Sequence, residues 1–389
     1  MAPPDARPVR IAIVVGEESG DNLGADLVSA LKRLHGGAVE LVGVGGPGLR
    51  AHGLQSLFDP DEIALMGFTA VIAKLPRLVG LISKTARAIV EAKPDCLVII
   101  DSPDFTHRVA RKVRKALPGL PVINYVCPSV WAWRPGRAPA MRAYVDHVLA
   151  LLPFEPGALA KLDGPACTYV GHPLVASAEV AAARKAQETR VRDRTRPTLL
   201  VLPGSRRSEV SRMMAPFRET VAHLAARGTD WRVVVPAVAH VEPLIREGCA
   251  GWAIAPEIVV GRQAKWEAFG TADAALAASG TVLLELALAG VPMVSTYHTD
   301  AIGRVMSRFI TAWSAALPNL VADYPVVPEY YNEQVRPPWL ARAMERLAAD
   351  TPERIAQMAS FGHIRAAMAT SRPSGELAAR VVLDHIAGR

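Results

Sequence analysis

Cysteine is scarce in this sequence, and no two cysteines are close together. The 389 residues contain only Cys96, Cys127, Cys167 and Cys249, without any CxxC spacing. This pattern indicates neither a disulfide scaffold nor a zinc site, and it favours a reducing cytoplasm. An HExxH motif and clusters of Asp and His are also missing, so we expect no metal ion and no other cofactor.

Long apolar runs are missing as well. No charge-free run reaches the roughly 18 residues that a membrane-spanning helix needs. The first ten residues, MAPPDARPVR, lead directly into a predicted strand and are too short for a secretion signal. We therefore expect a cytoplasmic protein that can touch a membrane without crossing it.

Aromatic residues make up only 6% of the chain, whereas half of its residues are hydrophobic. The length favours two domains, each with a mainly aliphatic core. The net charge of +7 favours anionic partners such as phosphorylated metabolites, nucleic acid or an anionic membrane. Because the positive charge is spread out and not interleaved with aromatics, a nucleic-acid module is disfavoured.

Short apolar strands alternate with helical segments through both halves of the chain. This alternation predicts an α/β fold of two Rossmann-like domains, whose parallel sheets face a central cleft that binds the ligand. A charged, Ala-rich segment without a buried stripe, Ala176 to Arg196, marks the expected junction. The predicted strands are Arg10–Val15, Val39–Val44, Cys96–Ile100, Val122–Val126, Val148–Pro153, Thr198–Leu202, Arg232–Val235, Ala274–Ala277 and Met293–Tyr297.

The segment from Asp273 to Pro292 combines a strand, a turn and a helix. Ser279-Gly280-Thr281 forms the predicted turn and helix N-cap, and the helix ends before Gly290. Free N–H groups of such a turn can bind a phosphate, and Glu285, one helical turn further on, could accept from a sugar hydroxyl. An ordinary βα turn with a surface glutamate is the alternative interpretation.

A second anion site is predicted at Gly204-Ser205-Arg206, directly after a strand. It combines a small turn, a hydroxyl and a permanently charged guanidinium, which suit a diphosphate. Arginine and a helix N-terminus can together offset leaving-group charge without a metal ion.

Asp101 is the candidate general base in the first half. It follows a buried strand, and the carboxyl ends of such strands border the ligand crevice of open α/β sheets. A cap on the following turn is the alternative role for Asp101. Other carboxylates on neighbouring loops are possible bases, namely Asp104, Glu17, Glu18 and Asp21. No GxSxG motif supports a serine hydrolase.

The apolar segment from Met66 to Leu81 carries Lys74 and Arg77 and is interrupted by Pro76. Two interpretations are open. The segment is either an amphipathic stretch that contacts a membrane or acyl chains, or a core-facing helix whose lysine and arginine side chains extend to bring their charged ends into water.

Many separate motifs occur in one order from the first strand to about Glu333. They are GEESGDNLGA, GVGGPGL, EIALMGF, DSPDF, PSVWAWRPGR, LLPFE, GHP, LPGSR, ASGTVLLE and LPNL. In this order they resemble the lipid-A-disaccharide synthase family. The chain departs from the family pattern at Ser102, where DAPDF is usual, and at Cys127, where SPSVWAW is usual; neither position is an implied catalytic group.

The resemblance implies an inverting glycosyltransferase of GT-B architecture. It would join UDP-2,3-diacylglucosamine to 2,3-diacylglucosamine 1-phosphate, release UDP and form a β-linked disaccharide with one carboxylate base. The implied domains are residues 1–175 for the acceptor, 176–345 for the UDP-sugar and 346–389 for helices that pack back on an N-terminal domain.

The resemblance also implies roles for particular residues. Asp101 resembles the base, and the donor-side residues would be Arg206, Ser279, Gly280, Thr281, Glu285 and Asn319. Ser19, Gly20 and Asp21 lie in a matching N-terminal loop, and Glu329 and Gln334 match polar donor-side groups loosely.

The implied partners are the two lipid substrates, the inner face of the inner membrane as a peripheral surface, and a second copy that exchanges C-terminal segments. Two other functions stay open: an isomerase like UDP-N-acetylglucosamine epimerases, and a nucleotide-sugar binder without enzymatic activity.

Overall fold

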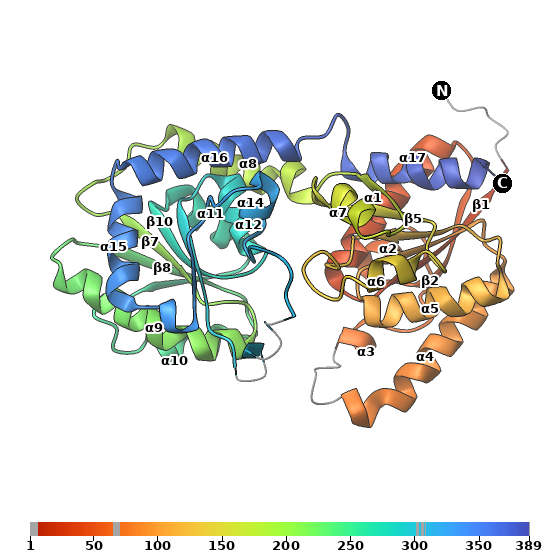
Figure 1. Ribbon diagram of the computed structural model, residues 1–389, viewed down its shortest axis with the longest axis horizontal. Coiled ribbons are helices and arrows are strands. Elements are labelled where there is room, and N and C mark those ends of the chain that lie inside the picture. Colours follow the sequence, from red (N-terminus) through yellow and green to blue (C-terminus); the bar gives the residue numbers. More distant parts are fainter. Residues whose placement is uncertain (1–6, 65–70, 301–302, 305–306, 308, 389) are drawn as a thin grey trace. The chain divides into compact units, whose positions relative to one another are not determined.

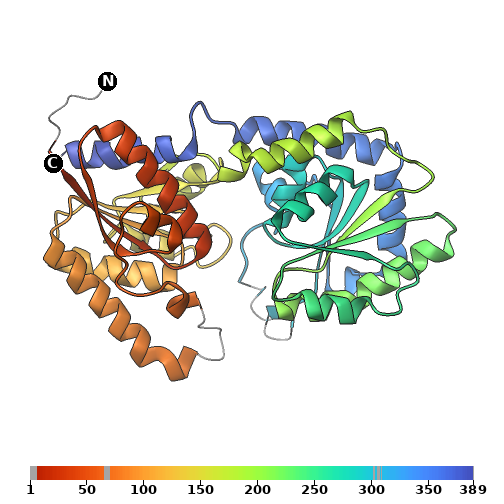
Figure 2. The ribbon, with the colours of Figure 1, turned by 180° about the vertical axis from the view of Figure 1, so that it is seen from behind.

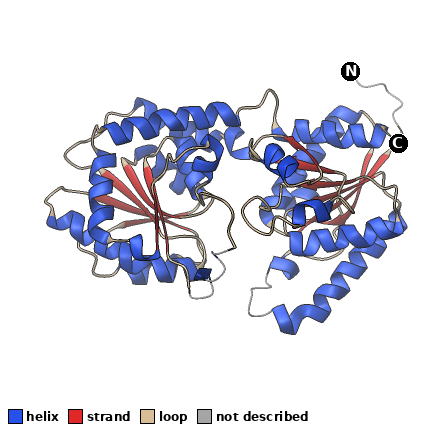
Figure 3. Ribbon diagram, in the orientation of Figure 1, coloured by secondary structure: helices blue, strands red, loops and turns tan. Residues whose placement is uncertain are grey.

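The computed structural model describes residues 7–64, 71–300, 303–304, 307 and 309–388, with the backbone only for residues 64 and 71–75. The chain forms two compact units, one of Met1–Pro173 with Thr370–Arg389 and one of Leu174–Ala369. Each unit has one sheet with helices on both of its faces (Figure 3). The predicted α/β fold with two Rossmann-like domains is confirmed.

The first unit contains six parallel strands in the order β2-β1-β3-β4-β5-β6. Their bounds are β1 (Val9–Val15), β2 (Val39–Val44), β3 (Cys96–Ile100), β4 (Val122–Tyr125), β5 (His147–Ala150) and β6 (Ala166–Tyr169). The chain turns outward in opposite directions from β1 and β3, and such a switch point is where open sheets bind ligands. Val15 pairs with Ile100, so the residues that follow β1 and β3 emerge side by side.

Helices cover both faces of this sheet (Figure 1). On one face, side chains of α1 (Glu18–His35), α2 (Pro47–Ala51) and α17 (Ser374–Ala387) join a core with β1 and β3. On the other face, a second core includes side chains of α4 (Val71–Ala92), α5 (Pro103–Ala116), α6 (Arg137–Met141) and α7 (Glu155–Lys161). A short helix, α3 (Asp61–Ala64), precedes α4.

The second unit has the strand order β12-β11-β10-β7-β8-β9, again all parallel. Its strands are β7 (Thr198–Leu202), β8 (Arg232–Ala237), β9 (Glu257–Val260), β10 (Ala274–Ala278), β11 (Met293–Tyr297) and β12 (Glu329–Tyr331). The switch point lies between β7 and β10. Ala277 pairs with Leu202 there, which brings the turns after β7 and β10 together.

The helices of the second unit also form two layers, visible from both sides in Figures 1 and 2. One layer contains α9 (Arg207–Ala226), α10 (Glu242–Cys249) and α15 (Pro337–Ala348). The other contains α8 (Ala178–Thr189), α11 (Arg262–Thr271), α12 (Val282–Ala289), α14 (Leu317–Ala322) and α16 (Pro352–Met368). Two 3₁₀ turns complete the described elements, η1 (Pro173–Ala176) and η2 (Asn332–Gln334).

The expected junction from Ala176 to Arg196 has more structure than its composition indicates. The Ser177 hydroxyl caps α8 by accepting from the Val180 amide at 3.3 Å. Val180 and Ala183 are buried, and α8 packs on α11 within the second unit. The prediction of a segment without a buried stripe is therefore wrong, because small alanines allow close helix packing without large apolar side chains.

The C-terminal segment divides between the two units. The helix α16 stays with the second unit, where it packs on α14, whereas α17 packs on α1 in the first unit. The third segment expected from residue 346 onward is thus split at Ala369 and Thr370.

Part of the segment from Met66 to Leu81 lies outside the described residues. From Val71 on it belongs to α4, where Val79 is 49% exposed. Further along the helix, Ile82, Ala86 and Ile89 are buried in the core. None of the helices in the described part of the chain is long and apolar enough to cross a membrane.

Candidate functional site

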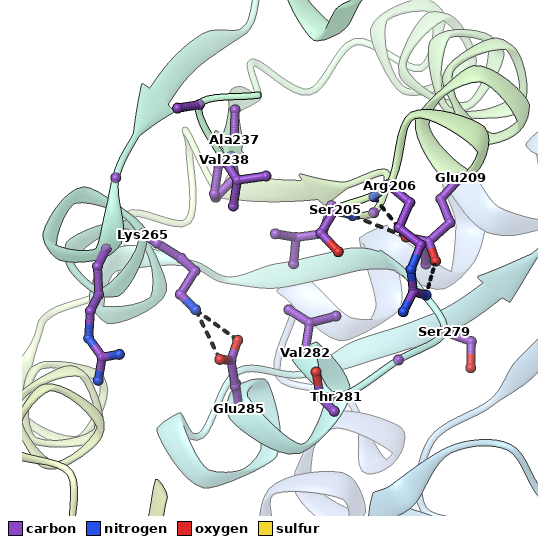
Figure 4. Close-up of a pocket in the computed structure, with 18 residues that line it drawn as sticks. Ser205, Arg206, Glu209, Ala237, Val238, Lys265, Ser279, Thr281, Val282 and Glu285 are labelled. Carbon is purple, nitrogen blue, oxygen red and sulfur yellow. Dashed lines mark hydrogen bonds and ion pairs between the residues drawn. The ribbon is translucent and has the colours of Figure 1, made fainter. Parts of the chain in front are cut away.

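A pocket of about 660 Å³ opens at the carboxyl ends of β7, β8 and β10. This position follows from topology, since the crevice of the second unit must open where the strand order reverses. Five of the six predicted donor-side residues line it, together with Gly204 and Ser205 of the second predicted anion site (Figure 4): Arg206, Ser279, Gly280, Thr281 and Glu285. The volume suits a nucleotide or a sugar nucleotide.

The turn after β7 is built around Glu209. Its Oε2 accepts hydrogen bonds from the amides of Ser205 and Arg206 at 3.1 and 3.2 Å. Gly204 has φ +115°, and a Cβ there would lie 2.6 Å from the Cβ of Glu209, so both the conformation and the space require glycine. The sequence motif predicted the turn, but it missed the carboxylate that shapes it.

Arg206 remains available on this turn. One guanidinium nitrogen donates to Glu209 Oε1 at 2.8 Å, and the side chain is 79% exposed. Arg206 lines the pocket, and the other N–H groups of its guanidinium can donate to an anion bound there.

The turn after β10 leads directly into α12. The Ser279 amide donates to the Thr296 carbonyl at 2.9 Å, and α12 begins at Val282. The first N–H groups of a helix have no intrahelical acceptor, so this turn offers donors to an anion beside Arg206.

Glu285 is held by a lysine that sequence reasoning missed. Lys265 Nζ donates to both carboxylate oxygens, at 2.9 and 3.0 Å (Figure 4). The same ammonium lies 4.7 Å from the ring centre of Trp266. Arg262 also lines the pocket, so three cations and two carboxylates surround it. Lys265 and Arg262 lie on α11 and belong to no motif that the sequence revealed, because only the fold brings them near Glu285.

Asn319 is placed differently from the expected donor-side residue. It is buried and does not line the pocket. Its Oδ1 accepts from the amides of Val326 and Val327 at 2.8 and 2.7 Å, and its Nδ2 donates to Glu329 Oε2 at 3.2 Å. The side chain therefore fixes the backbone that leads into β12.

The Asn319 network reaches the pocket indirectly. Glu329 accepts from the Tyr331 hydroxyl, which also lies in hydrogen-bonding contact with Ser279. Burial and the Glu329 carboxylate raise the pKa of the Tyr331 hydroxyl. Gln334, the other loosely matched residue, falls in η2 and does not line the pocket.

In the first unit, Asp101 directly follows β3 on unusual backbone. Its φ is +55°, and Ser102 follows with φ +42°. Asp101 Oδ1 accepts from the Ser102 amide at 2.8 Å, and Oδ2 accepts from the Ser19 hydroxyl at 3.3 Å. A Cβ at Gly16 would lie 2.3 Å from Ser102 Oγ, so glycine allows the turns after β1 and β3 to meet.

The predicted residues of the N-terminal loop have different positions. Ser19 contacts Asp101 through the hydrogen bond above, and Gly20 packs on Ile100 beneath it. Asp21 is buried, and its carboxylate accepts from the amides of Gly46, Gly48 and Leu49 at 2.7, 2.6 and 3.2 Å. Asp21 thus anchors the start of α2 to α1, which differs from the expected substrate contact.

A pocket of about 310 Å³ adjoins Asp101. Its wall includes His107, Asn124, Trp133 and Arg137, none of which was assigned a role from the sequence. Burial lowers the pKa of His107 to about 4, with further lowering by Arg137 and Arg111, so the imidazole is neutral at pH 7. The His107 ring contacts the Tyr144 hydroxyl at 3.0 Å.

The segment PSVWAWRPGR supplies much of this second pocket. Trp133 and Arg137 line it, whereas Trp131 donates to the buried Glu155 at 3.2 Å. The two tryptophans therefore differ in place: Trp133 lines the pocket, whereas Trp131 is hydrogen-bonded to a buried carboxyl group. The described residues contain no group of three or more His, Cys, Asp or Glu side chains that could hold a metal ion.

Solved structures share this two-unit fold. A crystal structure of the glycotransferase of kitacinnamycin has a TM-score of 0.63 and 18% identity, over 98% of this chain and all of that chain. The UDP-GlcNAc 2-epimerase from Neisseria meningitidis, bound to UDP-GlcNAc, has a TM-score of 0.56 and 11% identity over the same shares. Transferases and epimerases thus share the fold, and the fold alone does not separate them.

Sequence relationships do separate them. A family model described as lipid-A-disaccharide synthetase matches residues 11–381. The lipid-A-disaccharide synthase of Nitrobacter hamburgensis is 50% identical over 378 residues, which cover 96% of this chain and 95% of the relative. By this full-length match, the chain belongs to the lipid-A-disaccharide synthetase family.

Proposed function

We propose that the chain joins UDP-2,3-diacylglucosamine to 2,3-diacylglucosamine 1-phosphate, giving the β-linked disaccharide 1-phosphate and UDP. The pocket between the turns after β7 and β10 carries this proposal, because it combines an exposed arginine, a helix N-terminus and a positioned glutamate. These are the groups that a diphosphate and an adjoining ribose require.

In the proposed reaction, the donor diphosphate lies against Arg206 and the turn Ser279-Gly280-Thr281, and Glu285 accepts from a ribose hydroxyl. As the acceptor hydroxyl oxygen bonds to the anomeric carbon of the donor, the bond from that carbon to the diphosphate breaks. Negative charge then grows on the leaving UDP, where Arg206 and the helix N-terminus stabilise it.

Asp101 takes the proton of the attacking hydroxyl in this proposal. A single displacement inverts the α-linked donor to a β-linked product, so one carboxylate base is sufficient. The Ser19 hydroxyl and the Ser102 amide orient the carboxylate by hydrogen bonds to its two oxygens.

The test of this function compares diacylated and unacylated substrates. We expect the disaccharide only when UDP-2,3-diacylglucosamine and the acylated acceptor are both present. Conversion of UDP-N-acetylglucosamine alone would favour an epimerase and contradict the proposal. Binding of UDP without any product would instead favour a nucleotide-sugar binder.

We further propose peripheral attachment to the inner face of the inner membrane. The net charge of +7 supports contact with anionic lipid, and the segment from Met66 to Leu81 would supply apolar contacts. Association with anionic liposomes should weaken as salt rises, and salt-insensitive association would contradict the electrostatic part.

A homodimer with exchanged C-terminal segments completes the proposal. It is supported by the position of α17. A short connection, residues 369–373, separates α17 from α16, and α17 packs extensively on α1. In a dimer of this kind, α17 would make the same contacts with α1 of the second copy. Sedimentation of the full chain at micromolar concentration tests it, and a monomer there would contradict it.

A further inference from the structure

The 310 Å³ pocket beside Asp101 lies among strained backbone. Eight non-glycine residues in the described part of the chain have positive φ. Two of them, Asp101 and Val126, line this pocket, and two more, Ser102 and Arg134, directly follow lining residues in the sequence. Val126 is the clearest outlier, because a β-branched residue at φ +76° is sterically disfavoured. Such strain gathers where the surrounding structure must hold a functional geometry.

Two of the strained turns hold lining residues. The turn at Asp101 and Ser102 carries the Asp101 carboxylate, and the turn at Arg134 lies between two lining residues, Trp133 and Arg137. The Arg134 guanidinium stacks on the Trp133 ring at 4.0 Å, which adds positive charge beside the pocket.

The Arg137 guanidinium has more N–H donors than its bond to Asp104 uses. It donates to the Asp104 carboxylate at 3.1 Å, and the Asp104 side chain is 83% exposed. An ion pair this exposed is weak, because water solvates both groups. The planar guanidinium can therefore turn toward a ligand with two parallel N–H donors, the geometry that a phosphate prefers.

Besides Asp101, Asp104 and Arg137, the lining residues of the pocket are uncharged. His107 is buried and neutral at pH 7, and the Asn124 side chain donates to the Val126 carbonyl at 3.0 Å. The pocket thus combines the Asp101 carboxylate after β3, the half-buried Arg137 with its partner Asp104, and neutral polar groups. A phosphorylated sugar has matching groups, with a hydroxyl at one side of the ring and a dianion at another.

We infer that this pocket binds the acceptor sugar, with Arg137 on its phosphate and Asp101 on its attacking hydroxyl. The inference rests on the proposed function and assigns Arg137 as a specificity residue for the phosphorylated acceptor. Arg137 makes no bond to the reacting atoms, so its removal should act on acceptor binding more than on the chemical step.

The test removes the phosphate and the arginine separately and together. With the wild-type chain, an acceptor that lacks its 1-phosphate should lower kcat/KM by at least about tenfold, the effect of losing a charged hydrogen bond. Arg137→Ala should cause a similar loss with the phosphorylated acceptor, mainly through KM. In this variant, removal of the phosphate should then have little further effect.

Two control variants distinguish this role from a structural one. Arg142→Ala removes an exposed arginine of the same segment, paired with Asp163 outside the pocket, and should leave the acceptor KM unchanged. If Arg137 mattered only through its pair with Asp104, Asp104→Asn would reproduce the defect. We expect Asp104→Asn not to raise the acceptor KM, because the exposed pair contributes little and loss of this lining carboxylate removes a competitor for the Arg137 donors.

The outcomes separate the inference from the proposed function. If the wild-type chain makes no disaccharide from the acylated substrates, the proposed function is wrong and the inference falls with it. If the wild-type chain makes disaccharide but Arg137→Ala still discriminates against the unphosphorylated acceptor as strongly, only the inference is wrong. Unchanged UDP affinity in Arg137→Ala checks that the second unit is intact.

Discussion

Asp101 adopts a left-handed backbone conformation that few residues other than glycine, asparagine and aspartate tolerate. This matters for testing its role, because an alanine would change the backbone preference together with the side chain. Asparagine keeps both the conformation and the hydrogen-bond acceptor facing Ser102, and it removes only the ability to take a proton.

Asp101→Asn should lower the turnover number by at least about a hundredfold while the affinity for UDP stays unchanged. Steady-state kinetics and UDP titration measure the two quantities. Asp163→Asn removes an exposed carboxylate that does not line the pocket, so it is the control and should retain turnover within about threefold. A nearly wild-type rate for Asp101→Asn would move the base to another carboxylate, with Asp104, Glu17 and Glu18 as the neighbouring choices.

Arg206→Ala should weaken UDP binding by about tenfold or more, because it removes charged donors from the proposed diphosphate site. Calorimetric titration with UDP measures the change. The adjacent Arg207 is exposed and does not line the pocket, so Arg207→Ala should bind UDP normally. Equal affinities of Arg206→Ala and the wild-type chain would exclude the diphosphate role.

Individual site residues were predictable where a motif follows a strand. The residues of the turns at Ser205 and Ser279 all lie at one pocket, as the alternation of strands and helices predicts. Asp21 and Asn319 show the limit of this reasoning. Their side chains accept hydrogen bonds from backbone amides of other segments. The residue type alone does not distinguish such structural contacts from ligand contacts.

At the scale of elements, strand prediction succeeded for the buried strands and for the longer edge strand β2, and it failed at the three other sheet edges. The strands that sequence reasoning missed are β6, β9 and β12, all at the edge of a sheet. Each has three or four residues, and none of these is buried. A short edge strand has neither a continuous apolar run nor a clear alternation, so pairing with its neighbour defines it.

The start of α7 contains a buried carboxyl group, Glu155. It accepts from the amides of Leu151 and Leu152 at 3.1 and 3.0 Å and from the Trp131 indole. Burial raises the pKa of Glu155 to about 7, although the hydrogen bonds from Leu152 and Trp131 lower it. This contact ties the helix to the segment that also supplies Trp133 and Arg137.

Glu155 should make the first unit less stable as pH rises. Between its unfolded pKa of about 4.5 and its folded pKa of about 7, the native state holds a proton that the unfolded state has lost. Stability therefore falls through this window. Glu155→Gln cannot ionise, so its free energy of unfolding relative to wild type should rise by up to about 3 kcal/mol from pH 4.5 to 8.

Urea unfolding of both proteins across this pH range measures the difference. The comparison with wild type cancels the titration of all other groups, provided that both chains unfold in the same steps. A difference that is constant with pH would show that Glu155 is ionised throughout.

At the scale of the whole molecule, the two units differ in their buried histidines. His107, His147 and His172 all belong to the first unit, and burial lowers the pKa of each to about 4. His385 lowers the pKa of His147 further, since the two rings lie 5.0 Å apart between β5 and α17. The second unit has one lowered histidine, His298, which is less buried.

Acid should therefore destabilise the first unit before the second. Between pH 6.5 and 4 the unfolded state binds a proton at each of the three histidines while the native state does not, so the histidines lower the stability as pH falls, and Glu155 offsets only one of these three protons. Each histidine contributes up to about 1.4 kcal/mol per pH unit. Scanning calorimetry at pH 7 and pH 5 should show the transition of the first unit moving to lower temperature by more than that of the second.

Saturating UDP identifies the transitions, because a ligand of the second unit raises the unfolding temperature of that unit alone. His147→Asn should reduce the acid shift of the transition that UDP leaves unmoved, since one of the three protonation sites is gone. An equal acid shift of both transitions, or no change of the shift in His147→Asn, would show that buried histidines do not set the acid limit of this fold.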